Sequence, residues 1–231
     1  MNRTERIIDL FKMRFIHRYD CFPEQYKNNG GGYILRKEKL TDQIILSHLK
    51  GEKTIGLYGS QQSTTKWLCI DIDTLEEGIV REVQNHVRRL QIPYLTEFSG
   101  QKGYHIWIFF DKLYPNKIAR ALAGVFAFNN EVFPKQDYIE SGKHGNLIKA
   151  PLGKHQVSGE WCVFLNKDLK SKKDQYGTLE KIQPINPIQI LKNDIPKIWE
   201  ELDIPQSENK SPSNQFTAAK LPFIKDCVIK A

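Results

Sequence analysis

The sequence predicts an α+β fold, a mixed α/β arrangement built around a mixed sheet. Segments with strand character and segments with helical character alternate in mixed order, without a regular repeat of one supersecondary unit. The chain has 231 residues, of which 40% are hydrophobic and 26% are charged. This size and composition suit one large domain, or two interlocked subdomains, with a sizeable core.

Helices are predicted where apolar residues recur at helical spacing. They cover residues 4–15, 40–50, 75–90, 115–128 and 187–202. In the first of them Phe11 and Phe15 share one side with two isoleucines. Thr41 or Asp42 is a candidate cap for the start of the second helix.

Strands are predicted for the shorter apolar segments between the helices. They cover residues 54–58, 66–73, 93–98, 103–110, 146–150 and 161–164. Residues 28–32, which are two asparagines and three glycines, predict a flexible loop.

The composition changes near the end of the chain. Residues 207–213 are rich in Ser, Asn, Pro and Lys, which predicts a linker. The apolar residues 221–224 then begin an element without completing it. We therefore expect one domain over residues 1–206, with residues 207–231 forming a linker and the start of a region that continues in a longer protein.

The charge balance is basic, with a formal net charge of +7 and a pI of about 9.1. Nucleic acid is the commonest polyanionic partner of such proteins, although many basic proteins bind none. No apolar run approaches the roughly 20 residues of a membrane helix, so no membrane partner is expected. Residues 1–11 carry acids and lack the apolar core of a secretory signal, so we expect a cytoplasmic protein.

The four cysteines, Cys21, Cys69, Cys162 and Cys227, lie far apart in the sequence. No pair has the spacing of a structural zinc site, so no zinc is expected. Cys69 lies in an apolar strand and is interpreted as a small core residue.

Asp71 and Asp73 carry the strongest chemical signal. Residues two apart in a strand face the same side, so the two carboxylates point together while Ile70 and Ile72 face the other way. Paired carboxylates repel unless a cation lies between them, and oxygen ligands of this kind suit Mg²⁺ or Mn²⁺. The simpler interpretation is that Asp73 caps the following helix, but it leaves Asp71 unexplained.

A glycine-bounded turn follows, with Ser99, Lys102 and Gly103 before His105 at the start of an apolar strand. Exposed backbone N–H groups in such a turn can bind phosphate, and the serine, lysine and histidine side chains add further donors. The alternative is an ordinary β-hairpin whose histidine is satisfied within the fold.

Asp137 is the candidate third metal ligand, with Glu131 in reserve. Lys149 lies in an apolar strand and needs a partner if it is buried; a nucleotide phosphate would serve. Otherwise Lys149 is an edge-strand lysine that faces water. Two metal ions held by three carboxylates can activate a 3′-hydroxyl and stabilise a leaving pyrophosphate, but they can equally hydrolyse a phosphodiester.

These blocks resemble the archaeo-eukaryotic primase superfamily. Its motifs match Asp71 with Asp73, Ser99 with His105, and Asp137. The stretches that carry the resemblance are "HLKGEKTIGLY", "CIDID", "SGQKGYHIWIFF", "FPKQD", "GNLIKAPLG" and "DQYGTLEKI", in order between residues 48 and 182. The chain is most similar to the primase-polymerase domains of CRISPR loci and to conflict-system primases.

The resemblance implies an N-terminal α/β unit and an RRM-like unit that carries the site. It implies two Mg²⁺ or Mn²⁺ ions, nucleoside triphosphates, and a single-stranded DNA template and primer, for primer synthesis and extension. CRISPR adaptation proteins are further expected partners. Residues 26–36 contain no cysteine, so the cysteine cluster of many relatives is absent. A nuclease and a catalytically inactive nucleic-acid-binding module stay open as alternatives.

Two further expectations concern the substrates. Arg14, Arg18 and Lys135 are candidate contacts to the template backbone, without reading its sequence. Lys102, Lys149, Ser99 and His105 are expected to hold the nucleotide phosphates. Tyr138 is expected to contact the nucleotide sugar, so that deoxynucleotides are preferred to ribonucleotides.

Overall fold

The computed structural model of the protein describes residues 2–202. Most of the domain predicted over residues 1–206 therefore lies within the described part of the chain. The predicted linker and the apolar segment after it, residues 207–231, lie outside the described residues.

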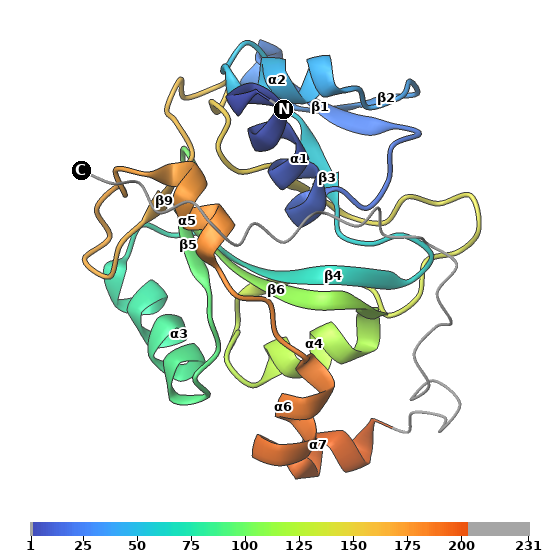
Figure 1. Ribbon diagram of the computed structural model, residues 1–231, viewed down its shortest axis with the longest axis vertical. Coiled ribbons are helices and arrows are strands. Elements are labelled where there is room, and N and C mark those ends of the chain that lie inside the picture. Colours follow the sequence, from blue (N-terminus) through green and yellow to red (C-terminus); the bar gives the residue numbers. More distant parts are fainter. Residues whose placement is uncertain (1, 203–231) are drawn as a thin grey trace.

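The centre of the fold is a five-stranded sheet with the order β7-β4-β6-β5-β9 (Figure 1). Its strands are β4 (Thr64–Ile72), β5 (Leu95–Phe98), β6 (Tyr104–Pro115), β7 (Glu131–Phe133) and β9 (Val163–Leu165). All neighbouring strands are antiparallel, whereas the sequence predicted a mixed sheet. The reason is that β6 lies between β4 and β5, so the two strands joined by helix α3 run the same way without being neighbours.

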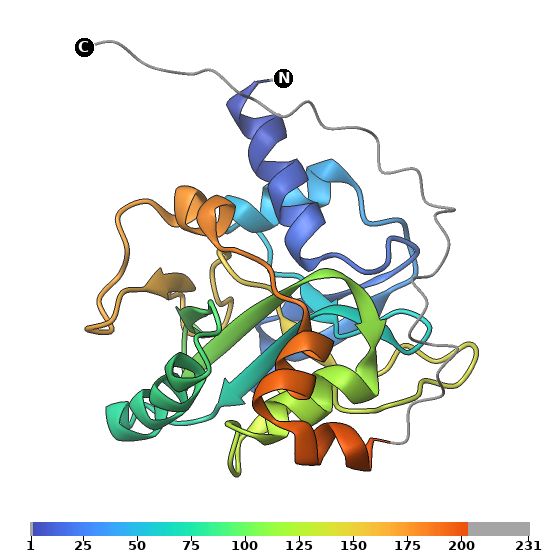
Figure 2. The ribbon, with the colours of Figure 1, turned by 60° about the horizontal axis from the view of Figure 1, so that its bottom comes forward.

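The even-numbered side chains of β4 face a layer of helices. This layer contains α3 (Glu77–Arg89), α4 (Asn116–Gly124) and α6 (Pro187–Asp194), with α7 (Pro196–Glu201) next to α6 (Figure 2). Leu68, Ile70 and Ile72 are completely buried in this apolar cluster. The predicted helix 187–202 is two helices, because Pro196 cannot continue the first one.

The odd-numbered side chains of β4 face an N-terminal layer. Its helices are α1 (Arg3–Phe15), α2 (Asp42–Leu49) and α5 (Gln175–Lys181). Its strands are β1 (Phe22–Tyr26), β2 (Gly32–Arg36), β3 (Gly56–Tyr58) and β8 (Leu147–Lys149). Trp67 and Trp107 of the large sheet pack edge to face against each other, and Trp107 packs edge to face against Phe15 of α1.

The N-terminal layer contains two antiparallel pairs, β1 with β2 and β3 with β8. They are linked by a bridge between Glu24 and Ile55. Of the two predicted caps, Thr41 caps α2, and the predicted loop 28–32 contains the short 3-10 helix η1 (Asn28–Gly30). No helix among residues 2–202 is long and apolar enough to cross a membrane.

Candidate active site

A row of polar side chains crosses the large sheet on the face toward the N-terminal layer. Asp71 on β4 lies directly opposite His105 on β6 and Glu131 on β7. His105 in turn lies opposite Glu97 on β5. Because directly opposed residues of antiparallel strands share a face, four chemically active residues lie side by side.

Asp71 and Asp73 stand where β4 ends. The Asp71 side chain is 22% exposed, and Asp73, immediately after the strand, is exposed. Both line an open cleft of about 260 Å³ between the two layers. The cleft is lined by Gln25, Tyr33, Asp71, Asp73, Ser99, Gln101, Lys102, His105, Leu147, Ile148, Lys149 and His155. The carboxylates, the turn and the histidine predicted from sequence are therefore brought together.

The ring of His105 is hydrogen-bonded to the buried carboxylate of Glu97. Its Nδ1 lies 2.9 Å from Glu97 Oε2, and its Nε2 lies 3.5 Å from Asp71 Oδ1. Burial alone would lower the pKa of His105, but the charge of Glu97 and hydrogen bonds to Asp71 and Glu97 outweigh it and raise this pKa to about 9. The histidine thus presents its Nε2 edge to the cleft.

Lys149 has a buried partner within the protein. Its Nζ donates to Glu97 Oε1 at 2.6 Å and to the Ala150 carbonyl at 3.0 Å, and its side chain is only 7% exposed. The partner of this buried lysine within the protein is therefore Glu97, so Lys149 is not an edge-strand lysine that faces water, and its contact to a nucleotide phosphate stays a prediction. Burial lowers the pKa of Lys149, but neighbouring acidic groups, Cys162 and Glu97, outweigh it and raise this pKa above its usual value.

The turn from Ser99 to Gly103 is closed by two hydrogen bonds. The Ser99 N–H donates to the Gly103 carbonyl at 2.9 Å, and the Gly103 N–H donates to Ser99 Oγ at 3.1 Å. A Cβ at Gly103 would lie 1.8 Å from the Ile72 carbonyl oxygen, so only glycine lets the turn approach the end of β4. Ser99 Oγ closes the turn as an acceptor and keeps its own hydrogen to donate, while Lys102 is exposed beside it.

Asp137 is not placed to complete the predicted metal site. The chain around it is anchored near Ser63, because the Ile139 N–H donates to Ser63 Oγ at 2.9 Å. Ser63 precedes β4, so it lies about 26 Å from Asp71 along the strand. Asp137 itself pairs with Arg120 at 2.7 Å and is 62% exposed. The metal-ligand prediction for Asp137 is therefore wrong, because β7 runs antiparallel to β4 and carries the following residues away from the site.

Tyr138 lies in the same distant loop and is 71% exposed, so the prediction that it contacts the nucleotide sugar is wrong for the same reason. The reserve candidate, Glu131, is the acidic residue opposite Asp71. Its carboxylate pairs with Lys135 at 2.5 Å and is 58% exposed.

The family described as "TOTE conflict system, Archaeo-Eukaryotic Primase domain" matches residues 6–193. The chain belongs to this family. Of the two groups that the sequence resembled, the matched one is the conflict-system group. No curated protein matches the primase domain in sequence.

Three solved structures are similar to the primase domain at low identity. The catalytic domain of primase RepB′ in complex with initiator DNA has 10% identity and a TM-score of 0.45, over 87% of this chain and 99% of that one. Primase RepB′ has 11% identity and a TM-score of 0.43, over 86% and 67%. The primase-polymerase domain of cyanophage S-2L has 10% identity and a TM-score of 0.42, over 72% and 90%.

The three predicted template contacts all have partners within the primase domain. Arg14 donates to the Ile182 carbonyl at 2.8 Å, and Arg18 forms a two-point ion pair with Asp20 at 2.8 and 2.5 Å. Lys135 pairs with Glu131. These interactions give the three basic residues partners in the unbound protein, and their role on a template stays a prediction.

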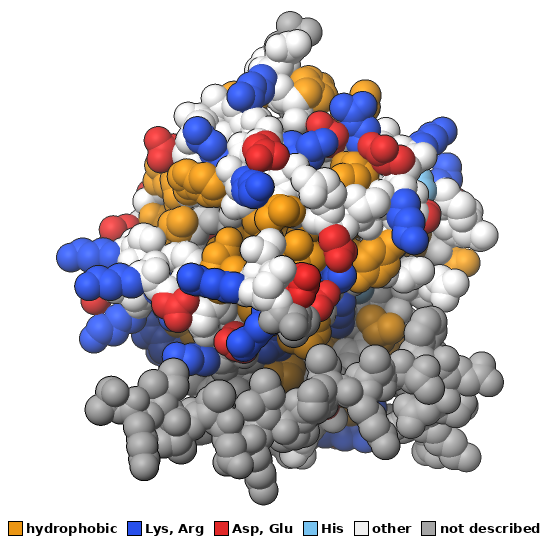
Figure 3. All heavy atoms as spheres, turned by 45° about the horizontal axis from the view of Figure 1, so that its top comes forward, with side chains coloured by type: hydrophobic (Ala, Val, Ile, Leu, Met, Phe, Trp, Pro, Cys, Tyr) orange, Lys and Arg blue, Asp and Glu red, His pale blue; other side chains and the backbone are white. Residues whose placement is uncertain are grey.

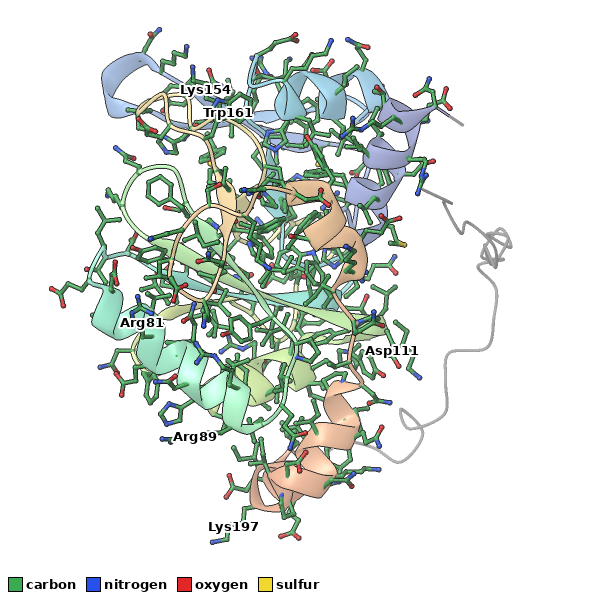
Figure 4. The ribbon with its side chains drawn as sticks, turned by 60° about the vertical axis from the view of Figure 1, so that its left-hand side comes forward. Arg81, Arg89, Asp111, Lys154, Trp161 and Lys197 are labelled. Carbon is green, nitrogen blue, oxygen red and sulfur yellow. The ribbon has the colours of Figure 1, made fainter. Side chains whose placement is uncertain are left out.

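Other basic side chains also lie on the surface. Figure 3 shows Lys and Arg side chains interspersed with acidic ones over the face that it views. Figure 4 places Arg81 and Arg89 on α3, and Lys154 beside Trp161 on the loop before β9. Lys154 directly precedes His155, which lines the cleft.

Carboxylate oxygens at the cleft are the donor set that Mg²⁺ and Mn²⁺ prefer, so Asp71 and Asp73 fit such ions. Within residues 2–202 no three His, Cys, Asp or Glu side chains converge closely enough to hold a metal as they stand. Glu131 would have to leave Lys135 to become a third ligand, which an exposed ion pair allows at little cost.

Four residues of the site were missed from the sequence: Glu97, Tyr33, Gln25 and His155. Glu97 carried a signal, because a charged residue within an apolar strand requires a buried partner. Gln25 and His155 hydrogen-bond to each other at 3.1 Å although 130 positions separate them. Nothing local in the sequence marks that contact.

Proposed function

We propose that this primase domain is a template-directed nucleotidyltransferase, which joins nucleoside triphosphates on single-stranded DNA in primer synthesis and primer extension. The observation that carries the proposal is the cross-strand row of Glu131, Asp71 and His105, with Asp73 beside it at the mouth of the cleft. It combines carboxylates for cations with a donor for phosphate on one rigid sheet face.

Asp71 and Asp73, with Glu131 as the third carboxylate, would hold two Mg²⁺ or Mn²⁺ ions. When bound, such ions favour ionisation of a 3′-hydroxyl and neutralise the leaving pyrophosphate. His105 directs its Nε2 into the cleft from a buried position, where it can donate to a phosphate oxygen. Lys102 and the Ser99 hydroxyl face the same cleft and can add further donors.

Tyr33 replaces Tyr138 as the proposed contact to the nucleotide sugar. It projects from β2 into the cleft that contains Asp71 and His105. Burial raises the pKa of its phenol well above the usual value, so the hydroxyl stays protonated. A bulky ring facing the metal-binding carboxylates would exclude a ribose 2′-hydroxyl, and we propose a preference for deoxynucleotides on this basis.

Template binding is proposed to be electrostatic, with Lys154, next to the cleft-lining His155, as a backbone contact. The net charge of +7 supports a polyanionic partner. A link to CRISPR adaptation proteins stays a prediction from sequence resemblance alone.

The experiment supplies single-stranded template, labelled nucleotides and Mg²⁺ or Mn²⁺, with and without a chelator. New polymer that disappears with the chelator supports the proposal. Shortened template instead of polymer would identify a nuclease, and neither product would identify a binding module. Asp71→Asn should abolish synthesis, while the matched control Asp168→Asn, in an exposed turn, should retain it.

A further inference from the structure

Glu97 is the most completely buried carboxylate at the site, and the chemistry proposed above does not use it directly. Its side chain is 0% exposed and accepts from three donors. These are Lys149 Nζ at 2.6 Å, the indole N–H of Trp107 at 2.7 Å, and His105 Nδ1 at 2.9 Å. Burying a charged carboxylate costs free energy, and three donors must be placed around it to offset that cost. An arrangement of this kind at the edge of the site therefore suggests a functional role.

The bonding pattern fixes one property of His105. Burial raises the pKa of Glu97, but Lys149 and His105 outweigh it and lower this pKa to about 2, so the carboxylate is ionised and can only accept. His105 Nδ1 must therefore carry a hydrogen, in either charge state of the ring. This leaves Nε2 as the nitrogen that faces Asp71 and the cleft.

Lys149 and Glu97 come from different sheets. Lys149 lies on β8, which pairs with β3 in the N-terminal layer, whereas Glu97 lies on β5 of the large sheet. Their ion pair crosses between the layers directly behind His105. Lys149 supplies the cation that makes a buried, ionised Glu97 tolerable, and so keeps the histidine's partner in its charged form.

We propose that Glu97 and Lys149 form a positioning pair, which uses the contact between the two layers to fix the ring of His105 with Nε2 directed into the cleft. The function proposed above assigns neither residue to the metal ions or to the nucleotide. The expected effect of the pair on synthesis rests on the function proposed for His105. Its effect on the orientation and Nδ1 hydrogen of the His105 ring does not depend on that function.

The first test measures the ring itself. In ¹H–¹⁵N spectra of the wild-type protein, His105 is expected to carry a hydrogen on Nδ1 that exchanges slowly and resonates downfield. Glu97→Gln removes the charged acceptor, so this signal should move upfield or broaden. A wild-type His105 without a hydrogen on Nδ1 would overturn the proposal, whatever the enzyme assays show.

The second test is a double-mutant cycle in primer extension. Glu97→Gln should lower kcat/KM by about 10- to 100-fold, as is typical when the partner of a functional histidine is lost. In a His105→Asn background the same change should have little further effect, because the group that Glu97 positions is gone. An equal loss in both backgrounds would show a general structural role and refute the pair.

Two controls keep the outcomes separate. Lys149→Arg retains the buried cation and should preserve the Nδ1 signal, whereas Lys149→Met should lose it; retention in both variants contradicts the proposal.

If Glu97→Gln does not fold, Glu97→Asp, which keeps the charge but withdraws the carboxylate, replaces it in the cycle. A wild-type protein that shows the Nδ1 signal but makes no polymer would refute the proposed function and leave the positioning pair standing.

Discussion

The contrast between Glu131 and Asp137 offers a sharp test of the site. Both are acidic residues close in sequence, but only Glu131 lies opposite Asp71 across the sheet. Asp137 follows a chain that is anchored at Ser63, about 26 Å from Asp71 by strand geometry. No carboxylate can reach a shared metal over that distance, so the two residues should respond very differently to the same substitution.

Glu131→Gln is expected to lower kcat/KM for primer extension by at least about 100-fold, which corresponds to about 2.7 kcal/mol of transition-state stabilisation. Asp137→Asn should leave it within about 2-fold. The side chains of Arg120 and Asp137 are 38% and 62% exposed, so loss of their ion pair should change the free energy of unfolding by less than about 1 kcal/mol.

The assay is steady-state extension of a labelled primer at saturating Mn²⁺, with thermal unfolding of each variant recorded beside it. Glu131→Gln should melt close to wild type, since its own ion pair with Lys135 is also largely exposed. A folded Asp137→Asn variant that loses as much activity as Asp71→Asn would contradict this assignment of the third carboxylate.

Three further outcomes follow. Gly103→Ala places a Cβ 1.8 Å from a carbonyl of β4 and should reduce synthesis strongly, whereas Gly78→Ala, with open space around it, should not; equal activity would contradict the close approach. Tyr33→Ser should raise ribonucleotide incorporation relative to deoxynucleotide incorporation in a single-nucleotide assay, and Tyr138→Ser should leave that ratio unchanged. Burial and nearby Lys66 lower the pKa of His17 to about 3, below its unfolded value near 6.5, so its contribution to stability is present above pH 6.5 and decreases below it, by up to about 1.4 kcal/mol per pH unit. A urea midpoint that does not change between pH 7 and pH 5 would exclude this effect.

The parts of the fold with a clear period were predictable from the sequence. Residues 66–73 and 103–110 were predicted as strands, and β4 and β6 are the two longest strands of the sheet. The alternation of Asp71 and Asp73 with apolar residues placed both carboxylates at one cleft, because a strand has a period of two. The β1–β2 hairpin and the short helix α5 were missed, since neither has a strong apolar period.

The errors at the site came from contacts that no local pattern records. The predicted role of Asp137 depended on motif order, but the register of β7 against β4 decides which acid faces Asp71. Lys149 was correctly expected to need a buried partner, and the partner turned out to be 52 positions earlier in the chain. Long-range register and ion pairing depend on how the two layers meet, which a single sequence does not show.

The origin of the Glu97–Lys149 pair also bears on how the chain folds. When strands β4, β5 and β6 have been synthesised, Glu97 is present but Lys149 is still to come. An ionised carboxylate without its cation resists burial, so the large sheet is expected to stay hydrated on this face until β8 docks. Bringing Lys149 to Glu97 closes a loop of 52 residues. This costs more conformational entropy than forming the local hairpin of β5 and β6, so it is expected to be slower. Late docking of β8 would therefore cover this polar face only after residue 149 has been synthesised, and nascent chains that end before residue 149 should expose it to hydrogen exchange.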